Sequence, residues 1–145
     1  MKRPKYLHRW CILITACYMG MIFLLSSLEI RSDSPISWAE ELLRRIPYID
    51  KIVHSGIYTG LGFFLLLALG RRRWLLAGFI GLVFAASDEF HQAFVPTRSP
   101  DVIDWLADAL GLGLGMLLAA WWEREFRRRR SRVAHAGSPE SSWRW

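Results

Sequence analysis

Two stretches of this 145-residue chain, residues 10–28 and 52–70, contain no lysine, arginine, aspartate or glutamate. A helix needs about 20 mostly apolar residues to cross the hydrocarbon core of a bilayer. Stretches of this length exclude an ordinary soluble domain, a disordered chain and a small secreted module stapled by disulfides. Both cysteines, Cys11 and Cys17, lie in the first stretch. Six residues apart on a helix, they point in different directions, so we interpret them as buried thiols without a metal or redox role.

Two further apolar segments complete a predicted all-α bundle of four transmembrane helices. One starts at Trp74 and continues through the acidic sequence DEFHQAF, and the other covers about residues 103–122. The first span is interpreted as uncleaved, because the sequence after it offers no clear signal-peptidase site. We therefore predict a basic N-terminus at residues 1–8, a membrane domain at 9–122 and an Arg-rich tail at 123–145. The last helix should run a few residues past Trp122 before the tail becomes disordered.

Basic residues are concentrated in three segments: the N-terminus, the turn at residues 71–73 and the C-terminal tail. These segments hold fourteen of the nineteen basic residues and three of the thirteen acidic ones. By the positive-inside rule, both termini and this turn lie in the cytoplasm. The net charge of +6 thus reflects membrane orientation, and no nucleic-acid partner is expected. The arginine run should contact anionic lipid head groups, with an RNA-binding tail as the alternative.

This orientation can be tested by cysteine labelling in intact cells. Ser34→Cys should react with a membrane-impermeant thiol reagent, because the first connection lies outside. Ser138→Cys should not react. The opposite labelling pattern would overturn the orientation.

The first outer connection, residues 29–50, contains a helix signal. Ser37 and Glu40 have the spacing of a capping box, and Pro47 stops a helix. We predict a short amphipathic helix here, either lying on the outer membrane surface or packing on the bundle.

Ionisable residues in the last three spans all lie toward the outer end. Asp50 and His54 are four residues apart and so share a helix face, and Asp88 and Gln92 repeat this spacing. Charged groups inside membrane spans are costly and are candidates for function. The candidate ligand-binding residues are Asp50, Lys51, His54, Tyr58, Asp88, Glu89, Gln92, Arg98, Asp104 and Asp108.

Structural roles compete with function at several of these positions. Asp50 and Lys51 could be plain interfacial charges, and Arg98 could be an internal ion-pair partner. Asp101 could simply cap the fourth helix. His54 and Tyr58 could form buried hydrogen bonds without taking part in chemistry, and His91 could face the lipid head groups. The glycines are interpreted as positions where helices pack closely: 56, 60, 62, 111, 113 and 115.

The mixture of side chains suggests three kinds of chemistry. His54 with Asp88 or Glu89 could act as an acid–base pair, so these three are the catalytic candidates. Lys51 and Arg98 could hold a phosphate or carboxylate. His54 with several carboxylates could also bind a divalent metal. No HExxH or Cys/His pattern supports a zinc site, however, so we expect neither a metal nor a cofactor. Whether any reaction is catalysed stays open.

Two motifs resemble those of VanZ-like membrane proteins. DKIVHSGIY, residues 50–58, resembles the family's Asp-Lys-x-x-His-x-x-x-Tyr motif, and DEFHQAFVPTRSPDVIDWLADALG, residues 88–111, resembles its second motif. The resemblance covers about residues 10–122. The matching positions of the second motif are Asp88, Glu89, Gln92, Phe94, Pro96, Arg98, Asp104, Asp108 and Gly111.

The resemblance implies a small multi-pass protein of a bacterial cell membrane. Its namesake is associated with resistance to the lipoglycopeptide teicoplanin. We therefore expect a cell-envelope protein that binds or acts on an amphiphilic ligand at an outward-facing polar pocket. The expected partners are membrane lipids and a lipid-linked envelope precursor or a lipoglycopeptide. A membrane enzyme for a lipid-linked substrate and an oligomeric transporter or partner subunit are the alternatives, and the oligomeric state stays open.

Overall fold

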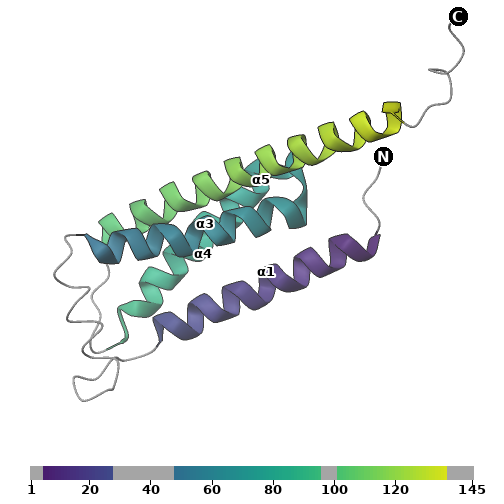
Figure 1. The fold of residues 1–145 in the computed structure, drawn as a ribbon. Coiled ribbons are helices and arrows are strands. Elements are labelled where there is room, and N and C mark those ends of the chain that lie inside the picture. The colour runs from purple at the N-terminus through teal and green to yellow at the C-terminus, as the bar shows by residue number, and fades with distance from the viewer. Residues whose placement is uncertain (1–4, 28–47, 96–100, 137–145) are drawn as a thin grey trace, which may run out of the picture.

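A computed structural model describes residues 5–27, 48–95 and 101–136, and this part of the chain is a helical bundle (Figure 1). The helices are α1 (Lys5–Ser26), α3 (Ile49–Leu69), α4 (Trp74–Gln92) and α5 (Val102–Ala136), with a short 3-10 turn, η1 (Arg71–Arg73), before α4. They alternate in direction, so α1 and α4 end where α3 and α5 begin. The predicted all-α bundle is confirmed. The predicted outer helix within residues 29–50 lies almost wholly outside the described residues.

Three helices are long and apolar enough to cross a membrane: His8–Ser27, Ile49–Leu69 and Val102–Val133. Helix α4 has 19 residues, a length of about 28 Å. Its last turns carry Asp88, Glu89 and Gln92, which lower its mean hydropathy. Because α4 packs against α3 and α5, it remains our predicted fourth span.

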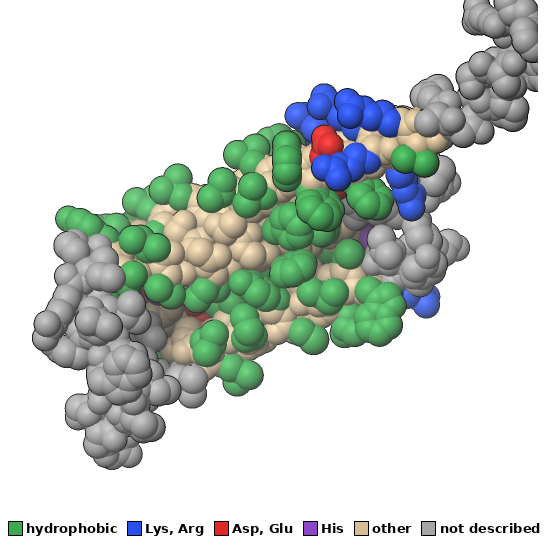
Figure 2. All heavy atoms as spheres, in the orientation of Figure 1, with side chains coloured by type: hydrophobic (Ala, Val, Ile, Leu, Met, Phe, Trp, Pro, Cys, Tyr) green, Lys and Arg blue, Asp and Glu red, His purple; other side chains and the backbone are tan. Residues whose placement is uncertain are grey.

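The outer surface of the bundle is apolar, as a lipid solvent requires. Large side chains such as Leu24, Leu75, Leu110 and Leu117 are about two-thirds exposed or more. Figure 2 shows hydrophobic side chains over the visible face and lysines and arginines gathered where α5 leaves the bundle. Cys17 also lies on the surface, so the prediction that both cysteines are buried is wrong for Cys17, although both are free.

Helices α3 and α5 form the most extensive interface, and glycines bring their backbones together. A Cβ atom at Gly111 would collide with the carbonyl oxygen of Ser55, and one at Gly115 with that of Thr59. The spacing of Gly111 and Gly115 is the small-xxx-small pattern of membrane helix pairs. Gly62 meets the Leu112 carbonyl in the same way. The predicted packing role holds for these glycines and for Gly60 beside Tyr18, but Gly56 and Gly113 have no neighbour within 4 Å.

Helix α5 continues to Ala136, well past the few residues expected beyond Trp122. Glutamate and arginine are good helix formers, and the chain has no glycine or proline between Trp122 and Gly137. Arg129 Nε also donates to Glu125 Oε1 over 3.1 Å, one helical turn apart. The disorder expected for the rest of the tail concerns residues beyond those described.

Candidate functional site

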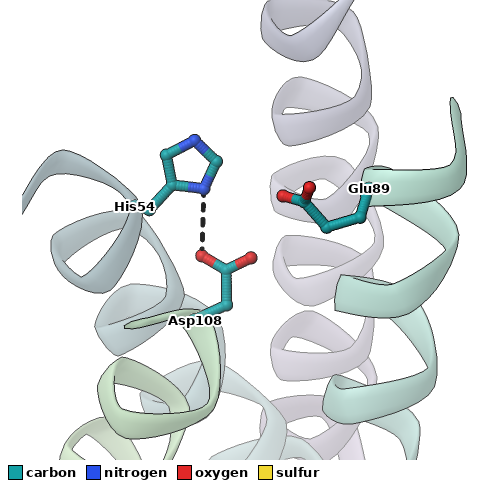
Figure 3. A group of neighbouring side chains, drawn as sticks. All are labelled: His54, Glu89 and Asp108. Carbon is teal, nitrogen blue, oxygen red and sulfur yellow. Dashed lines mark hydrogen bonds and ion pairs between the residues drawn. The ribbon is translucent and has the colours of Figure 1, made fainter. Parts of the chain in front are cut away.

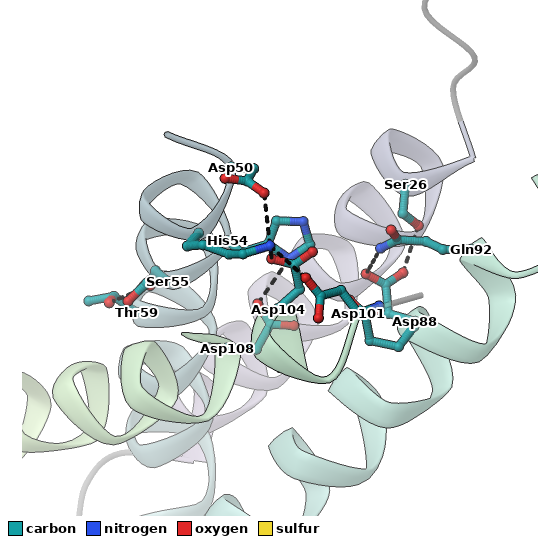
Figure 4. Close-up of polar contacts among 12 residues, drawn as sticks. Ser26, Asp50, His54, Ser55, Thr59, Asp88, Gln92, Asp101, Asp104 and Asp108 are labelled. Carbon is teal, nitrogen blue, oxygen red and sulfur yellow. Dashed lines mark hydrogen bonds and ion pairs between the residues drawn. The ribbon is translucent and has the colours of Figure 1, made fainter. Parts of the chain in front are cut away.

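Polar side chains gather at the end of the bundle where α1 and α4 end and α3 and α5 begin (Figure 4). All four helices contribute. The described residues with polar contacts there are Ser26 and Ser27 from α1, Asp50, Lys51 and His54 from α3, Asp88, Glu89, His91 and Gln92 from α4, and Asp101, Asp104 and Asp108 at the start of α5.

Lys51 is surrounded by carboxylates. Its Nζ atom lies 2.9 Å from Asp50 Oδ2, 2.9 Å from Asp101 Oδ2 and 2.7 Å from Asp104 Oδ1. The Lys51 side chain is 19% exposed, whereas that of Asp50 is 57% exposed. Three acidic partners neutralise this ammonium, so in this arrangement Lys51 is not free to bind an anionic ligand.

Asp101 has two structural tasks. Its Oδ1 atom accepts a hydrogen bond of 2.8 Å from the backbone N–H of Ile103, which caps the first turn of α5. Its Oδ2 atom accepts from Lys51, and the hydrogen bond from this ammonium holds the pKa of Asp101 below its ordinary value. The capping role that competed with function in the sequence therefore agrees with the structure.

Asp88 ties α1 to α4. Ser26 Oγ donates to Asp88 Oδ1 over 2.6 Å, and Gln92 Nε2 donates to Asp88 Oδ2 over 3.3 Å. Both carboxylate oxygens of Asp88 thus have partners, although the residue is 2% exposed. Its contacts make Asp88 a helix-packing group more than a free acid or base.

A second contact joins the same two helices, between Ser27 Oγ and His91 Nε2 at 2.9 Å. The His91 ring also packs on Phe23, with ring centroids 4.3 Å apart. His91 therefore contacts α1, a role that differs from the expected one at the head groups. Sequence reasoning missed Ser26 and Ser27, although two adjacent hydroxyls in the last turn of an apolar span were the available signal.

His54, Glu89 and Asp108 come from three different helices and point toward one another (Figure 3). The contact between His54 Nδ1 and Asp108 Oδ1 measures 3.1 Å. Glu89 Oε2 accepts a hydrogen bond of 3.1 Å from the backbone N–H of Asp101. Asp108 is fully buried and Glu89 is 7% exposed. A buried carboxylate that orients an imidazole is an arrangement suited to proton transfer or to ligation of a cation.

Three buried oxygen atoms beside this group have no hydrogen-bond partner in the described part of the chain: Glu89 Oε1, Asp108 Oδ2 and the Tyr58 hydroxyl. Tyr58 is 1% exposed and lies within reach of the charges of Asp88, Glu89 and Asp108. Buried polar atoms normally have hydrogen-bond partners, so these three oxygen atoms are the part of the site that could still bind a ligand.

The structure therefore brings together nine of the ten predicted ligand-binding residues at one end of the bundle. Arg98, the tenth, lies outside the described residues. Of the three catalytic candidates, His54 and Glu89 belong to the group that they form with Asp108. Asp88 instead contacts Ser26 of α1.

The sequence profile of a family described as VanZ/LLP1 matches residues 10–123, most of the chain. No curated protein and no solved structure matches the chain.

Proposed function

The chain belongs to the VanZ/LLP1 family, and from this premise we propose that it binds the polar part of an amphiphilic ligand at the polar end of its bundle. The observation that carries the proposal is the enclosed polar group of His54, Glu89 and Asp108 inside a bundle with an apolar outer surface. A ligand with a lipid tail can lie against such a surface while its head reaches the polar end. Burying charges in a membrane protein is costly, which favours a functional reason for them.

The proposed location is a bacterial cell membrane, with both termini in the cytoplasm. The basic segments around α1, η1 and α5 support this orientation. The end of the bundle that carries the polar side chains then faces the outer leaflet. Lipid-linked envelope precursors and lipoglycopeptide antibiotics are present on this side of the membrane. A contribution to resistance against teicoplanin-type agents fits this placement.

The head group that we favour is a phosphate or pyrophosphate. Lys51 is already neutralised by three carboxylates. Arg98 belongs to the connection between α4 and α5, three residues before Asp101 in the sequence. Its guanidinium can bind phosphate oxygens in a bidentate way.

Arg98→Lys tests this role. We expect the variant to accumulate in the membrane but to bind a short-chain polyprenyl pyrophosphate at least about tenfold more weakly, because an ammonium cannot reproduce the guanidinium fork. Binding would be measured in phosphatidylcholine nanodiscs, with the corresponding polyprenol as the ligand lacking an anionic head. The matched control is Arg129→Lys, which changes an exposed arginine at the opposite end of the molecule.

Equal binding of the pyrophosphate by Arg98→Lys and by the unmodified chain would contradict the anion-binding role of Arg98. Equal binding of the pyrophosphate and the polyprenol would contradict recognition of the head group altogether. In cells, the same variants at matched expression would be compared for susceptibility to teicoplanin.

A membrane enzyme is the second candidate, and the contact between His54 and Asp108 favours it. The carboxylate holds Nδ1 of the imidazole at 3.1 Å, which orients the ring for acid–base work with its other nitrogen. Turnover of a lipid-linked substrate by the purified protein, lost on His54→Ala, would select this candidate over simple binding.

A further inference from the structure

We propose that His54, Glu89 and Asp108 bind one divalent transition-metal ion, Zn²⁺ or Mn²⁺, between α3, α4 and α5. Each of the three residues offers one ligand atom, and these atoms all lie within 4.8 Å of one another. Bonds from zinc to nitrogen and oxygen ligands are about 2.0–2.2 Å long. Two ligand atoms on opposite sides of an ion are thus about 4 Å or a little more apart. Small side-chain movements therefore suffice for one ion to contact all three residues.

The unpartnered oxygens give independent support for a ligand at this point. Glu89 Oε1 and Asp108 Oδ2 are buried and have no hydrogen-bond partner among the described residues. Figure 3 shows the Glu89 carboxylate directed from α4 toward His54 and Asp108. A buried carboxylate oxygen without a partner loses its solvation and gains nothing in return. A cation between the two carboxylates would bind both oxygens at once.

The charge balance of the site also favours a cation. In the described part of this end of the bundle, Lys51 is the only lysine or arginine, and it already contacts three acidic side chains. Glu89, Asp88 and Asp108 have no lysine or arginine partner there. A divalent ion would compensate two of these negative charges.

The ligand set indicates the kind of ion. Mg²⁺ and Ca²⁺ prefer oxygen ligands alone, whereas an imidazole nitrogen with carboxylates suits Zn²⁺ and Mn²⁺. The sequence suggested His54 with several carboxylates as an option for a divalent metal. It did not single out Glu89 and Asp108, because the three residues are 35 and 19 residues apart and lie on three helices. No short spacing of the kind found in helical or Cys/His metal motifs links them.

Three protein ligands leave at least one position of the ion open. If the proposed function is correct, an oxygen of the phosphate head group can occupy that position. The ion would then supply positive charge that the neutralised Lys51 does not. This link rests on the proposed function, whereas binding of the ion itself does not.

The test is a metal titration of the purified full chain in detergent after removal of metals with a chelator. Co²⁺ serves as the spectroscopic probe, and Zn²⁺ and Mn²⁺ compete for the same site. We expect one ion per chain, visible absorption of bound Co²⁺, and its loss on addition of Zn²⁺. His54→Ala, Glu89→Gln and Asp108→Asn should each weaken binding at least about 100-fold, because the loss of a group that only hydrogen-bonds to a metal ligand weakens binding by about 10- to 100-fold.

Matched controls separate the site from general effects of charge. Asp50→Asn removes an exposed carboxylate at the same end of the bundle, and His91→Ala removes a histidine that contacts α1. Both should keep the Co²⁺ spectrum. The Gln and Asn variants keep side-chain shape, and their thermal unfolding without metal shows whether they fold. If a single variant does not fold, the titration of the unmodified chain still shows whether the chain binds one metal ion.

Co²⁺ binding by the unmodified chain that is no tighter than binding by the folded Glu89→Gln variant would overturn the proposal. So would a spectrum that His91→Ala abolishes and His54→Ala leaves intact. Metal binding is measured without lipid, so a chain that binds the ion but not the polyprenyl pyrophosphate would contradict the proposed function alone. Pyrophosphate binding that is unchanged by the chelator would refute the link between ion and head group.

Discussion

Gly115→Val is expected to prevent the close packing of α3 on α5, whereas Gly113→Val should leave the bundle intact. A side chain at Gly115 would collide with the backbone of Thr59 and Phe63, which cannot move aside as a flexible side chain can. Overpacking a tight contact costs about 1–3 kcal/mol, and a collision with backbone belongs at the upper end or beyond. Gly113 lies on the same helix with nothing within 4 Å of an added Cβ, so it controls for the helix propensity of valine.

The measurement is the yield of monodisperse protein in detergent together with its thermal unfolding. Gly111→Val should behave like Gly115→Val, because its Cβ would meet the backbone of Ser55. Similar unfolding temperatures for the variants at Gly113 and Gly115 would contradict the packing of these helices.

Lys51→Met should be the second most disruptive change. It removes the cation between Asp101 and Asp104, whose carboxylates then repel each other at the start of α5. The Lys51 and Asp104 side chains are only partly buried, at 19% and 15% exposure. The expected loss therefore lies between the about 0.2–1 kcal/mol of an exposed ion pair and the about 3–5 kcal/mol of a buried pair that loses one partner. Asp50→Asn removes the most exposed of the three partners and should change stability by about 0.5 kcal/mol or less.

The pH dependence provides a separate check on Lys51→Met. Protonation of Asp101 removes its negative charge beside Asp104, so the deficit relative to the unmodified chain should shrink as the pH falls below about 4. The unmodified chain should instead lose stability over this range, because Lys51 lowers the pKa of Asp101 and that stabilisation disappears as the carboxyl is protonated. A deficit that is independent of pH would show that lost packing, and not charge, explains the variant.

The bundle was largely predictable because its signals are local. The length of an apolar run predicts a span, and the spacing of Gly111 and Gly115 predicts a face that a neighbouring helix can approach. The end of α5 was less predictable. A dense arginine run is typical of a solvated tail, but arginine also favours a helix, and neither glycine nor proline interrupts the chain between Trp122 and Gly137.

The site was predictable as a set of residues but not as a set of contacts. Spacing placed Asp50 and His54 on one face of one helix, yet Asp50 contacts Lys51 and His54 contacts Asp108 from α5. Helical periodicity shows which residues share a face, but it does not show which face of a neighbouring helix they meet. For the same reason, the contact between Ser26 and Asp88, 62 residues apart, had no counterpart in the sequence pattern.

The distribution of charge between α3 and α5 has a consequence for how the chain enters a membrane during synthesis. Lys51 is made about fifty residues before Asp101 and Asp104, the two partners that begin α5. When α3 leaves the ribosome, the Lys51 ammonium therefore has only one of its three acidic partners, the neighbouring Asp50. The face of α3 that will pack against α5 has no protein partner yet. The ion pairs of Lys51 with Asp101 and Asp104, and the close packing of α3, can therefore form only after α5 has been made.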